Sequence, residues 1–402
     1  MTITNQNIAE ARKRRVTYNT ADVLIIGAGV LGCALAVALG EQGRSVLLLE
    51  SSLKEPDRIV GELLQPGGVH ALEQLGLRDC LEGIDAIKVH GYYVSYYGDS
   101  VNVPYPKDSG STEGKAPEGR SFHHGRFIVK LREAAMACPN VSVVETKATE
   151  LVTCSLNKQV LGVKSESRDG KRDCYFADIT VVADGYASKF RKGHHEHIPK
   201  MRSRFYGLEL IDAPLPMPGY GHVLLSQNPP MLLYQIGSHE TRILVDVPEN
   251  LPSASTDKGG VRGHLRNIVA PSLPESIQGP FISALEGKGQ LRSMPNSFLP
   301  ASTNKTPGLI MLGDALNMRH PLTGGGMTVA FSDVVIIRDV LSPEKVPDLG
   351  DTKKVLEQML VFHWKRKHGS SVINILSMAL YSLFAADSKS SLLPKLQLTC
   401  NY

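Results

Sequence analysis

Cysteine is scarce in this sequence, and the cysteines that are present form no recognisable pairs. The 402 residues include only six cysteines, and none of them form a Cys-x-x-Cys motif. A chain of this length with so few cysteines is not held together by a disulfide framework, which favours a reducing compartment. The histidine pairs at 123–124 and 194–195 have no further ligands at the spacing of a zinc site, so we expect no bound metal.

Long hydrophobic runs and a strong excess of one charge are also missing. No uninterrupted apolar stretch reaches the roughly 18 residues that a membrane-spanning helix needs. The most apolar late segment, residues 372–386, fits either a core helix or a helix lying on a membrane face. The formal net charge is only +4, and basic residues are not interleaved with aromatic ones. The composition therefore gives no reason to expect nucleic acid as a partner.

What the sequence does contain is the pattern of an α/β protein. Residues 22–26 and 44–50 are expected to be buried strands on either side of a helix at 34–39, which makes one βαβ unit. An antiparallel sheet facing a ligand is expected from the strand patterns at 204–210, 222–225, 231–236 and 241–247. Residues 98–121 are polar and rich in Gly, Pro and Ser, which predicts a surface loop. Helices are expected from residue 326 to about 386.

A glycine motif follows the first expected strand. Gly27, Gly29 and Gly32 form a Gly-x-Gly-x-x-Gly sequence at the start of the first helix. The first glycine permits a tight turn, the second lets the backbone approach a pyrophosphate, and the third lets the helix pack closely on the strand. The N-terminus of the helix stabilises phosphate charge. Glu50 ends the second strand, where a carboxylate accepts a hydrogen bond from a ribose hydroxyl. In this context the motif predicts a dinucleotide site.

Two further aspartate motifs follow apolar strands. Asp184-Gly185 comes after residues 179–183, and Gly313-Asp314 comes after residues 309–312. An aspartate at a strand end can bond a ribitol hydroxyl, and the glycine run at 324–326 can present backbone N–H groups to an anionic ligand.

The longer strings around these motifs resemble a known enzyme family. They are RIVGELLQPGG (58–68), GRSFHHGRFIV (119–129), VVADGYASKFRK (181–192), ETRILVDV (240–247), LRSMPNSFLP (291–300) and MLGDALNMRHPLTGGGMTVAF (311–331). This set is similar to the squalene monooxygenases, also called squalene epoxidases, within the para-hydroxybenzoate-hydroxylase-like flavoprotein monooxygenases. The similarity runs from about residue 20 to about residue 390.

The resemblance implies a role for particular residues. The expected FAD-contacting positions are Gly27, Gly29, Gly32, Glu50, Arg58, Arg126, Asp184, Asp314 and Met327. Gln65 and Tyr92 resemble a hydrogen-bonded catalytic pair that shapes the active site and helps to orient the alkene. Residues expected in the substrate pocket are Tyr234, Pro321, Leu322 and Phe384. Plainer alternatives stay open: surface salt bridges for the two arginines, and core packing for the tyrosine-rich strand and for Phe384.

The resemblance also implies an activity. Such an enzyme is an FAD-dependent monooxygenase that converts squalene to (S)-2,3-oxidosqualene in sterol or triterpenoid biosynthesis. It uses O2 and electrons from NADPH, delivered by NADPH–cytochrome P450 reductase, through a C4a-hydroperoxide of the flavin. A second Gly-x-Gly-x-x-Gly motif, which would suggest a dedicated NADPH domain, is not present in the sequence. The expected location is the cytosolic face of the endoplasmic reticulum membrane, with peripheral attachment.

The fold class expected is α/β (α+β): a Rossmann-like FAD-binding domain, an antiparallel-sheet substrate domain and a C-terminal helical segment. The expected division is a basic N-terminal arm (1–21), the first part of the FAD-binding domain (22–200), the substrate-binding sheet domain (201–300), the second part of the FAD-binding domain (301–340) and a helical segment able to associate with a membrane (341–402).

Two departures from the resembling family leave alternatives open. The N-terminal residues show no membrane helix, and residues 398–402 do not resemble the further helical region that relatives carry. A truncated form that binds FAD without catalysis is one alternative. Another is a non-catalytic prenyl-binding escort protein on a related fold, and a third is a different enzyme on the same fold.

Overall fold

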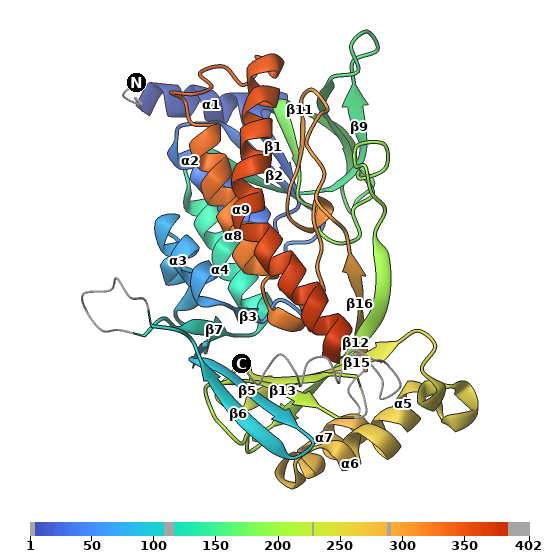
Figure 1. Ribbon diagram of the computed structural model, residues 1–402. Helices are drawn as coiled ribbons and strands as arrows, with labels where there is room; N and C mark the ends of the chain where they lie inside the picture. The colour runs from blue at the N-terminus through green and yellow to red at the C-terminus, as the bar shows by residue number, and fades with distance from the viewer. Residues whose placement is uncertain (1–4, 108–115, 227–228, 288–290, 385–402) are drawn as a thin grey trace.

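The computed structural model describes residues 5–107, 116–226, 229–287 and 291–384. Its first large sheet has seven strands in the order β8-β2-β1-β11-β10-β9, with β17 beside β11 (Figure 1). These strands are β1 (Thr20–Ile26), β2 (Val46–Glu50), β8 (Val141–Glu145), β9 (Lys147–Thr153), β10 (Val160–Glu166), β11 (Arg172–Val182) and β17 (Leu309–Met311). The pairings β8-β2, β2-β1, β1-β11 and β11-β17 are parallel, so the carboxyl ends of these strands lie at one edge. This is the Rossmann-like sheet that the sequence predicts.

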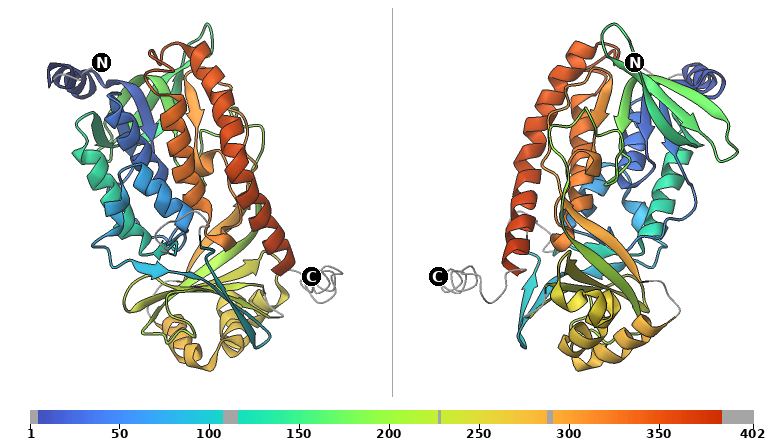
Figure 2. Two further views of the ribbon diagram at one scale, coloured as in Figure 1. Left: turned by 60° about the vertical axis from the view of Figure 1, so that its left-hand side comes forward. Right: turned by 90° about the vertical axis from the view of Figure 1, so that its right-hand side faces the viewer.

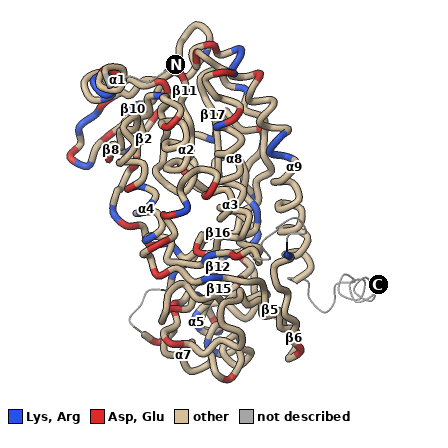
Figure 3. The backbone as a smooth tube through the Cα atoms, turned by 90° about the vertical axis from the view of Figure 1, so that its left-hand side faces the viewer, with Lys and Arg blue, Asp and Glu red and all other residues tan. Residues whose placement is uncertain are grey.

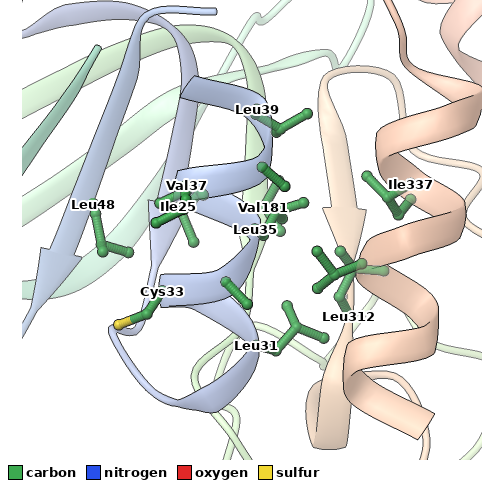
Figure 4. Close-up of a cluster of buried hydrophobic side chains, with 14 of the residues drawn as sticks. Ile25, Leu31, Cys33, Leu35, Val37, Leu39, Leu48, Val181, Leu312 and Ile337 are labelled. Atoms are coloured by element: carbon green, nitrogen blue, oxygen red, sulfur yellow. The ribbon is translucent and has the colours of Figure 1, made fainter. Parts of the chain in front are cut away.

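Helices that pack on this sheet and on one another bury an apolar core. They are α2 (Val30–Glu41), α3 (Pro66–Gln74), α4 (His124–Ala137), α8 (Gly326–Val340) and α9 (Thr352–Phe384). Helix α2 is apolar on all sides and is buried from Leu31 to Gly40, as expected for a helix enclosed by protein. Figure 4 shows side chains from the sheet, from α2 and from α8 meeting in one cluster: Ile25, Leu35, Val181, Leu312 and Ile337.

The second large sheet has the order β16-β12-β15-β14-β13-β5-β6. Its strands are β5 (Gly91–Tyr96), β6 (Asp99–Pro104), β12 (Lys200–Ile211), β13 (Gly221–Leu225), β14 (Met231–Gln235), β15 (Glu240–Pro248) and β16 (Arg292–Phe298). The four strands expected between 204 and 247 are present. A group of short helices packs beneath this sheet: α5 (Gly260–His264), α6 (Ala270–Ser272) and α7 (Glu275–Glu286).

The expectation of a surface loop over residues 98–121 is wrong at both of its ends. Residues 99–104 form β6, which pairs with β5 and extends the second sheet. Residues 119–121 form β7 (Gly119–Ser121), which joins β3 (Leu63–Leu64) and β4 (Ile87–Val89) in a three-stranded sheet. Strand β6 is an edge strand exposed along its whole length, so Val101 and Val103, which alternate with polar residues, bury no face of the strand. Residues 108–115 lie outside the described residues.

The basic N-terminal arm is a helix docked on the first sheet. Helix α1 (Asn5–Tyr18) contacts β1 and β8. Arg15 from the basic cluster is buried, and its guanidinium donates hydrogen bonds to Ser142 Oγ (2.9 Å), Ser45 Oγ (2.9 Å) and the carbonyl oxygen of Pro139 (2.8 Å). The sequence predicted a basic arm here, and the structure shows that one of its arginines fixes a helix by donating to three acceptors at once.

Helix α9 contains most of the late apolar segment. Figure 2 shows it running along the outside of the molecule and ending beside the second sheet. One side is buried at Ser377 and Tyr381, while Val372, Ile375 and Leu376 are exposed. Among the helices of the described ranges, none combines the length and the apolarity needed to cross a membrane. Charged residues of both signs are spread over both halves of the molecule, as Figure 3 shows.

Candidate active site

A cavity of about 760 Å³ lies where the carboxyl ends of the first sheet meet one face of the second. From the first sheet it is lined by the residues that end β1 and β2 and by residues that follow β11 and β17. From the second sheet it is lined by Val223, Leu232 and Leu244 on β13, β14 and β15. In open α/β folds ligands bind at this carboxyl edge, so the fold itself marks the cavity as the candidate site.

The three motif glycines have different surroundings. Gly27 has φ +106°, and a Cβ there would lie 2.5 Å from the Ala183 carbonyl oxygen. A Cβ on Gly32 would lie 1.9 Å from the carbonyl oxygen of Gly27, so this glycine permits close packing of helix on strand. Gly29 is the N-cap of α2, lines the cavity, and has no atom within 4 Å of a Cβ placed on it. The open space above Gly29 and the helix N-terminus fit a pyrophosphate.

Arg132 is a cavity residue that the sequence analysis missed. Its Nε donates to the Ala28 carbonyl oxygen at 3.0 Å, and Nη2 lies 3.6 Å from Glu50 Oε2. Glu50 Oε2 in turn accepts a hydrogen bond from the Ala28 N–H at 2.8 Å. The sequence held a signal for this role, because Arg132 is a charged residue on the buried, mostly apolar face of α4 that also carries Ile128 and Leu131.

Arg126 does not reach this cavity. Its side chain is 38% exposed and lies 3.9 Å from Asp85 and 4.0 Å from Glu240. Arg126 and Arg132 share α4, but six residues turn the helix by roughly 240°, so they face different ways. Arg126 is not among the residues that line the cavity, and its surroundings fit the alternative of a surface ion pair.

The two aspartate motifs lie together at the cavity wall. Asp184 Oδ1 is buried and has no hydrogen-bond partner among the described residues, which fits a hydroxyl-bearing ligand. Burial raises the pKa of the Asp184 and Asp314 carboxyls, and nearby arginines partly oppose that shift. Arg191 joins the motifs by donating to the carbonyl oxygens of Tyr186 and Asp314, each at 3.0 Å. Sequence analysis did not assign this joining role to Arg191.

Most of the expected cofactor positions line the same cavity. They are Gly27, Gly29, Glu50, Arg58, Asp184, Asp314 and Met327. Met327 is in the first turn of α8, so a second helix N-terminus points toward the cavity. Open space at Gly29, an unpartnered carboxylate oxygen and a wall of cationic and glycine residues together fit FAD.

Gln65 and Tyr92 form the expected hydrogen bond. Gln65 Nε2 donates to Tyr92 Oη at 2.6 Å and to the Thr323 carbonyl oxygen at 3.0 Å. The Tyr92 hydroxyl donates to the same carbonyl oxygen at 3.0 Å. Burial raises the pKa of Tyr92 to about 12, so the hydroxyl keeps its proton near neutral pH. Tyr92 lines the cavity, and Thr323 closes the network from the 3-10 turn Pro321–Thr323.

Only some of the residues expected in the substrate pocket line the cavity. Tyr234, Pro321 and Leu322 line the cavity. Phe384 is not among the lining residues and packs against the apolar cluster that includes Tyr234 and Leu322. For Phe384 the core alternative therefore describes its surroundings.

A buried ion pair supports the wall beside Tyr234. Arg242 donates from Nε and Nη2 to the two carboxylate oxygens of Glu62 at 2.8 and 2.9 Å. Burial raises the pKa of Glu62, and the hydrogen bonds from Arg242 act against this. The bidentate pairing neutralises a charge that would otherwise face an apolar cavity.

Solved structures share the whole architecture. The p-nitrophenol 4-monooxygenase PnpA of Pseudomonas putida superposes with a TM-score of 0.75 at 17% identity, covering 94% of this chain and 93% of that one. PqsL of Pseudomonas aeruginosa gives 0.73 at 21% identity, covering 91% and 97%. At these identities the likeness establishes the fold, which is that of the flavin-dependent monooxygenases.

Sequence relatives define the family more narrowly. A family model described as squalene epoxidase matches residues 176–402. Squalene epoxidase erg1 of Aspergillus fumigatus is 73% identical over 379 residues, which are 94% of this chain and 78% of the relative. Squalene epoxidase erg1 of Schizosaccharomyces pombe is 47% identical over 372 residues, covering 92% and 79%. The chain belongs to the squalene epoxidase family, as the motif strings indicated.

Proposed function

We propose that this chain epoxidises squalene to (S)-2,3-oxidosqualene with FAD as its cofactor. The overall reaction consumes squalene, O2, NADPH and a proton, and yields the epoxide, water and NADP⁺. The observation that carries the proposal is the cavity itself, which joins a nucleotide-type end at Gly29 to an apolar end at Leu322. Family membership supports the identity of the substrate.

The nucleotide-type end has the groups that would hold FAD. The N-terminus of α2 at Gly29 would stabilise the pyrophosphate, and Glu50 would accept a bond from a ribose hydroxyl. Asp184 Oδ1 has unused acceptor capacity for a further hydroxyl. Bound FAD supplies the redox chemistry that activates O2 for transfer of one oxygen atom to an alkene.

The apolar end would position the alkene and exclude water. Squalene has no hydrogen-bonding group, so a wall without free donors suits it. The Tyr92 hydroxyl is committed to Thr323, and Glu62 is committed to Arg242. The residues at the apolar end would therefore shape the pocket and exclude water from it, and no side chain has to act as a strong base.

Electron supply and location complete the proposal. NADPH–cytochrome P450 reductase would deliver the electrons from NADPH. The enzyme would sit on the cytosolic face of the endoplasmic reticulum membrane without spanning it. Exposed apolar side chains on α9 support surface attachment: Leu360, Val361, Trp364, Val372, Ile375 and Leu376. Such a location places the cavity near a lipid-dissolved substrate.

The test is conversion of squalene by the purified chain with FAD, NADPH, O2 and the reductase. We expect 2,3-oxidosqualene from the wild type and none from Gly29→Trp, whose side chain would fill the cavity. Gly279→Trp is the matched control, because Gly279 is exposed on α7 and a Cβ there meets nothing within 4 Å. A wild type that binds FAD and makes no product would favour the inactive form. A wild type that binds squalene and no FAD would favour an escort protein.

A further inference from the structure

Tyr105 lies behind the Gln65–Tyr92 pair and completes its hydrogen bonding. It follows β6, and its ring meets that of Tyr92 edge-on, with centroids 6.0 Å apart and planes at 83°. The Tyr105 hydroxyl lies 2.5 Å from Gln65 Oε1. Unlike Tyr92, it is not among the residues that line the cavity.

The carbonyl oxygen of Thr323 decides how the Gln65 amide is oriented. A carbonyl oxygen can only accept hydrogen bonds, so the amide nitrogen of Gln65 must face it. The two N–H groups are then used by Thr323 and Tyr92. The amide oxygen is left facing Tyr105, which must act as the donor.

The same constraints fix the direction of the Tyr92 hydroxyl. Because Tyr92 Oη accepts from Gln65, its single hydrogen is free to point at the Thr323 carbonyl oxygen, 3.0 Å away. Burial raises the pKa of the Tyr105 hydroxyl, so Tyr105 keeps the proton that it donates. The Tyr92 hydroxyl hydrogen is therefore used by the Thr323 carbonyl oxygen, although Tyr92 itself lines the cavity.

We propose that Tyr105 is a positioning residue, which holds the Gln65 amide so that Tyr92 keeps its hydroxyl hydrogen turned away from the cavity. This inference rests on the proposed squalene epoxidation. Without the Tyr105 hydroxyl, Gln65 Oε1 would lose the one side-chain donor that the described residues give it. A buried acceptor without a partner is costly, so the amide would turn toward water or toward another donor. The reorientation would release Tyr92 and let water approach the alkene.

The test uses Tyr105→Phe in the holoenzyme, with Tyr97→Phe as the control because Tyr97 is 56% exposed. We expect Tyr105→Phe to keep its FAD content and to lower the ratio of oxidosqualene formed to NADPH oxidised about tenfold. Gln65→Leu should do the same, and the double variant should be no worse than Gln65→Leu alone. Wild-type coupling in Tyr105→Phe, or losses that multiply in the double variant, would overturn the inference.

Failure of the underlying function gives a different result. If the wild type makes no oxidosqualene, the proposed function is wrong, and melting temperatures then decide the role of Tyr105. Tyr105→Phe and Gln65→Leu should each lower the melting temperature by a few degrees, and the double variant should lower it no further than the larger single effect. Independent, additive effects would show that Tyr105 does not act through Gln65.

Discussion

The hydroxyl groups of Thr323 and Ser377 lie 2.6 Å apart, and this contact joins helix α9 to the wall of the cavity. The carbonyl oxygen of the same Thr323 accepts hydrogen bonds from Gln65 and Tyr92. A second link comes from Asn374 Oδ1, which accepts from Arg319 Nε at 2.6 Å. The position of a long surface helix is therefore coupled to the orientation of the Gln65 and Tyr92 side chains.

Ser377→Ala should loosen this coupling. Ser377 is fully buried, so its loss leaves the Thr323 hydroxyl without that partner and should cost about 1–2 kcal/mol of unfolding free energy. We also expect a lower kcat for squalene, because the carbonyl group of Thr323 loses its fixed position. Urea unfolding and steady-state kinetics measure both effects. Ser382→Ala, on the exposed side of α9, is the control, and equal behaviour of the two variants would contradict the coupling.

The glycines of the first motif should separate cofactor binding from folding. Gly32→Ala should lower the unfolding free energy by about 1–3 kcal/mol, because its Cβ would collide with the Gly27 carbonyl oxygen. Gly29→Ala has room and a backbone φ of −89° that alanine adopts, so its apoprotein should melt like the wild type. Its FAD affinity should nevertheless fall, since the added methyl group faces the cavity. Differential scanning fluorimetry and a flavin titration test this, and an unstable Gly29→Ala apoprotein would be the contrary result.

Arg132 and Arg126 make a matched pair on one helix. Arg132→Ala should weaken FAD binding about tenfold or more, because it removes the hydrogen bond that fixes the backbone at Ala28 beside the cavity. Arg126→Ala should change the FAD dissociation constant by no more than about twofold, since exposed ion pairs contribute little. Titration of deflavinated protein with FAD, followed by flavin fluorescence, compares them. A larger effect at Arg126 would restore its expected role as a cofactor contact.

His222 should make the fold less stable at acidic pH. Burial lowers the pKa of His222 from 6.5 to about 4, and Met217 N–H donates to its Nε2 at 3.2 Å. Because the folded pKa is the lower one, the contribution of His222 is complete above pH 6.5 and is lost as the pH falls toward 4. The loss should reach up to about 3 kcal/mol.

His222→Gln isolates this effect, because glutamine can still accept from Met217 and does not titrate. Urea unfolding at pH 8 and pH 4.5 should show a larger drop for the wild type than for the variant. Buried carboxyls with raised pKa values, such as Glu62 and Asp184, act in the opposite direction in both proteins and cancel in the comparison. Equal drops would show that His222 is not kept neutral by burial.

The sequence alone was enough for the features that depend on local order. The strand–helix turn requires a positive φ at Gly27, which glycine adopts readily. The apolar run before it is typical of a strand inside a parallel sheet. Both the turn and the strand could therefore be predicted from the neighbouring residues. The four strands between 204 and 247 were found for the same reason. The family strings specified the chemistry even more narrowly.

The edge strand β6 and the docked helix α1 were missed because their positions depend on contacts with distant segments. Strand β6 gains its hydrogen bonds from β5 and shows no buried face of its own. Helix α1 is held through Arg15 by acceptors on β8 and in loops, such as Ser142, which is 127 residues away in the chain. Such contacts depend on where distant segments meet.

Local sequence thus determined the cofactor motifs and many of the strands and helices, because turn geometry and periodicity act between neighbouring residues. The resemblance of the longer strings indicated the family. Only the tertiary structure decided that Arg132 and not Arg126 lines the cavity, that Phe384 packs against an apolar core cluster, and that Tyr105 lies within hydrogen-bonding distance of Gln65. Each of these outcomes depends on the direction in which a side chain leaves its helix or strand after packing. That direction is set by segments far away in the chain, which no local pattern records.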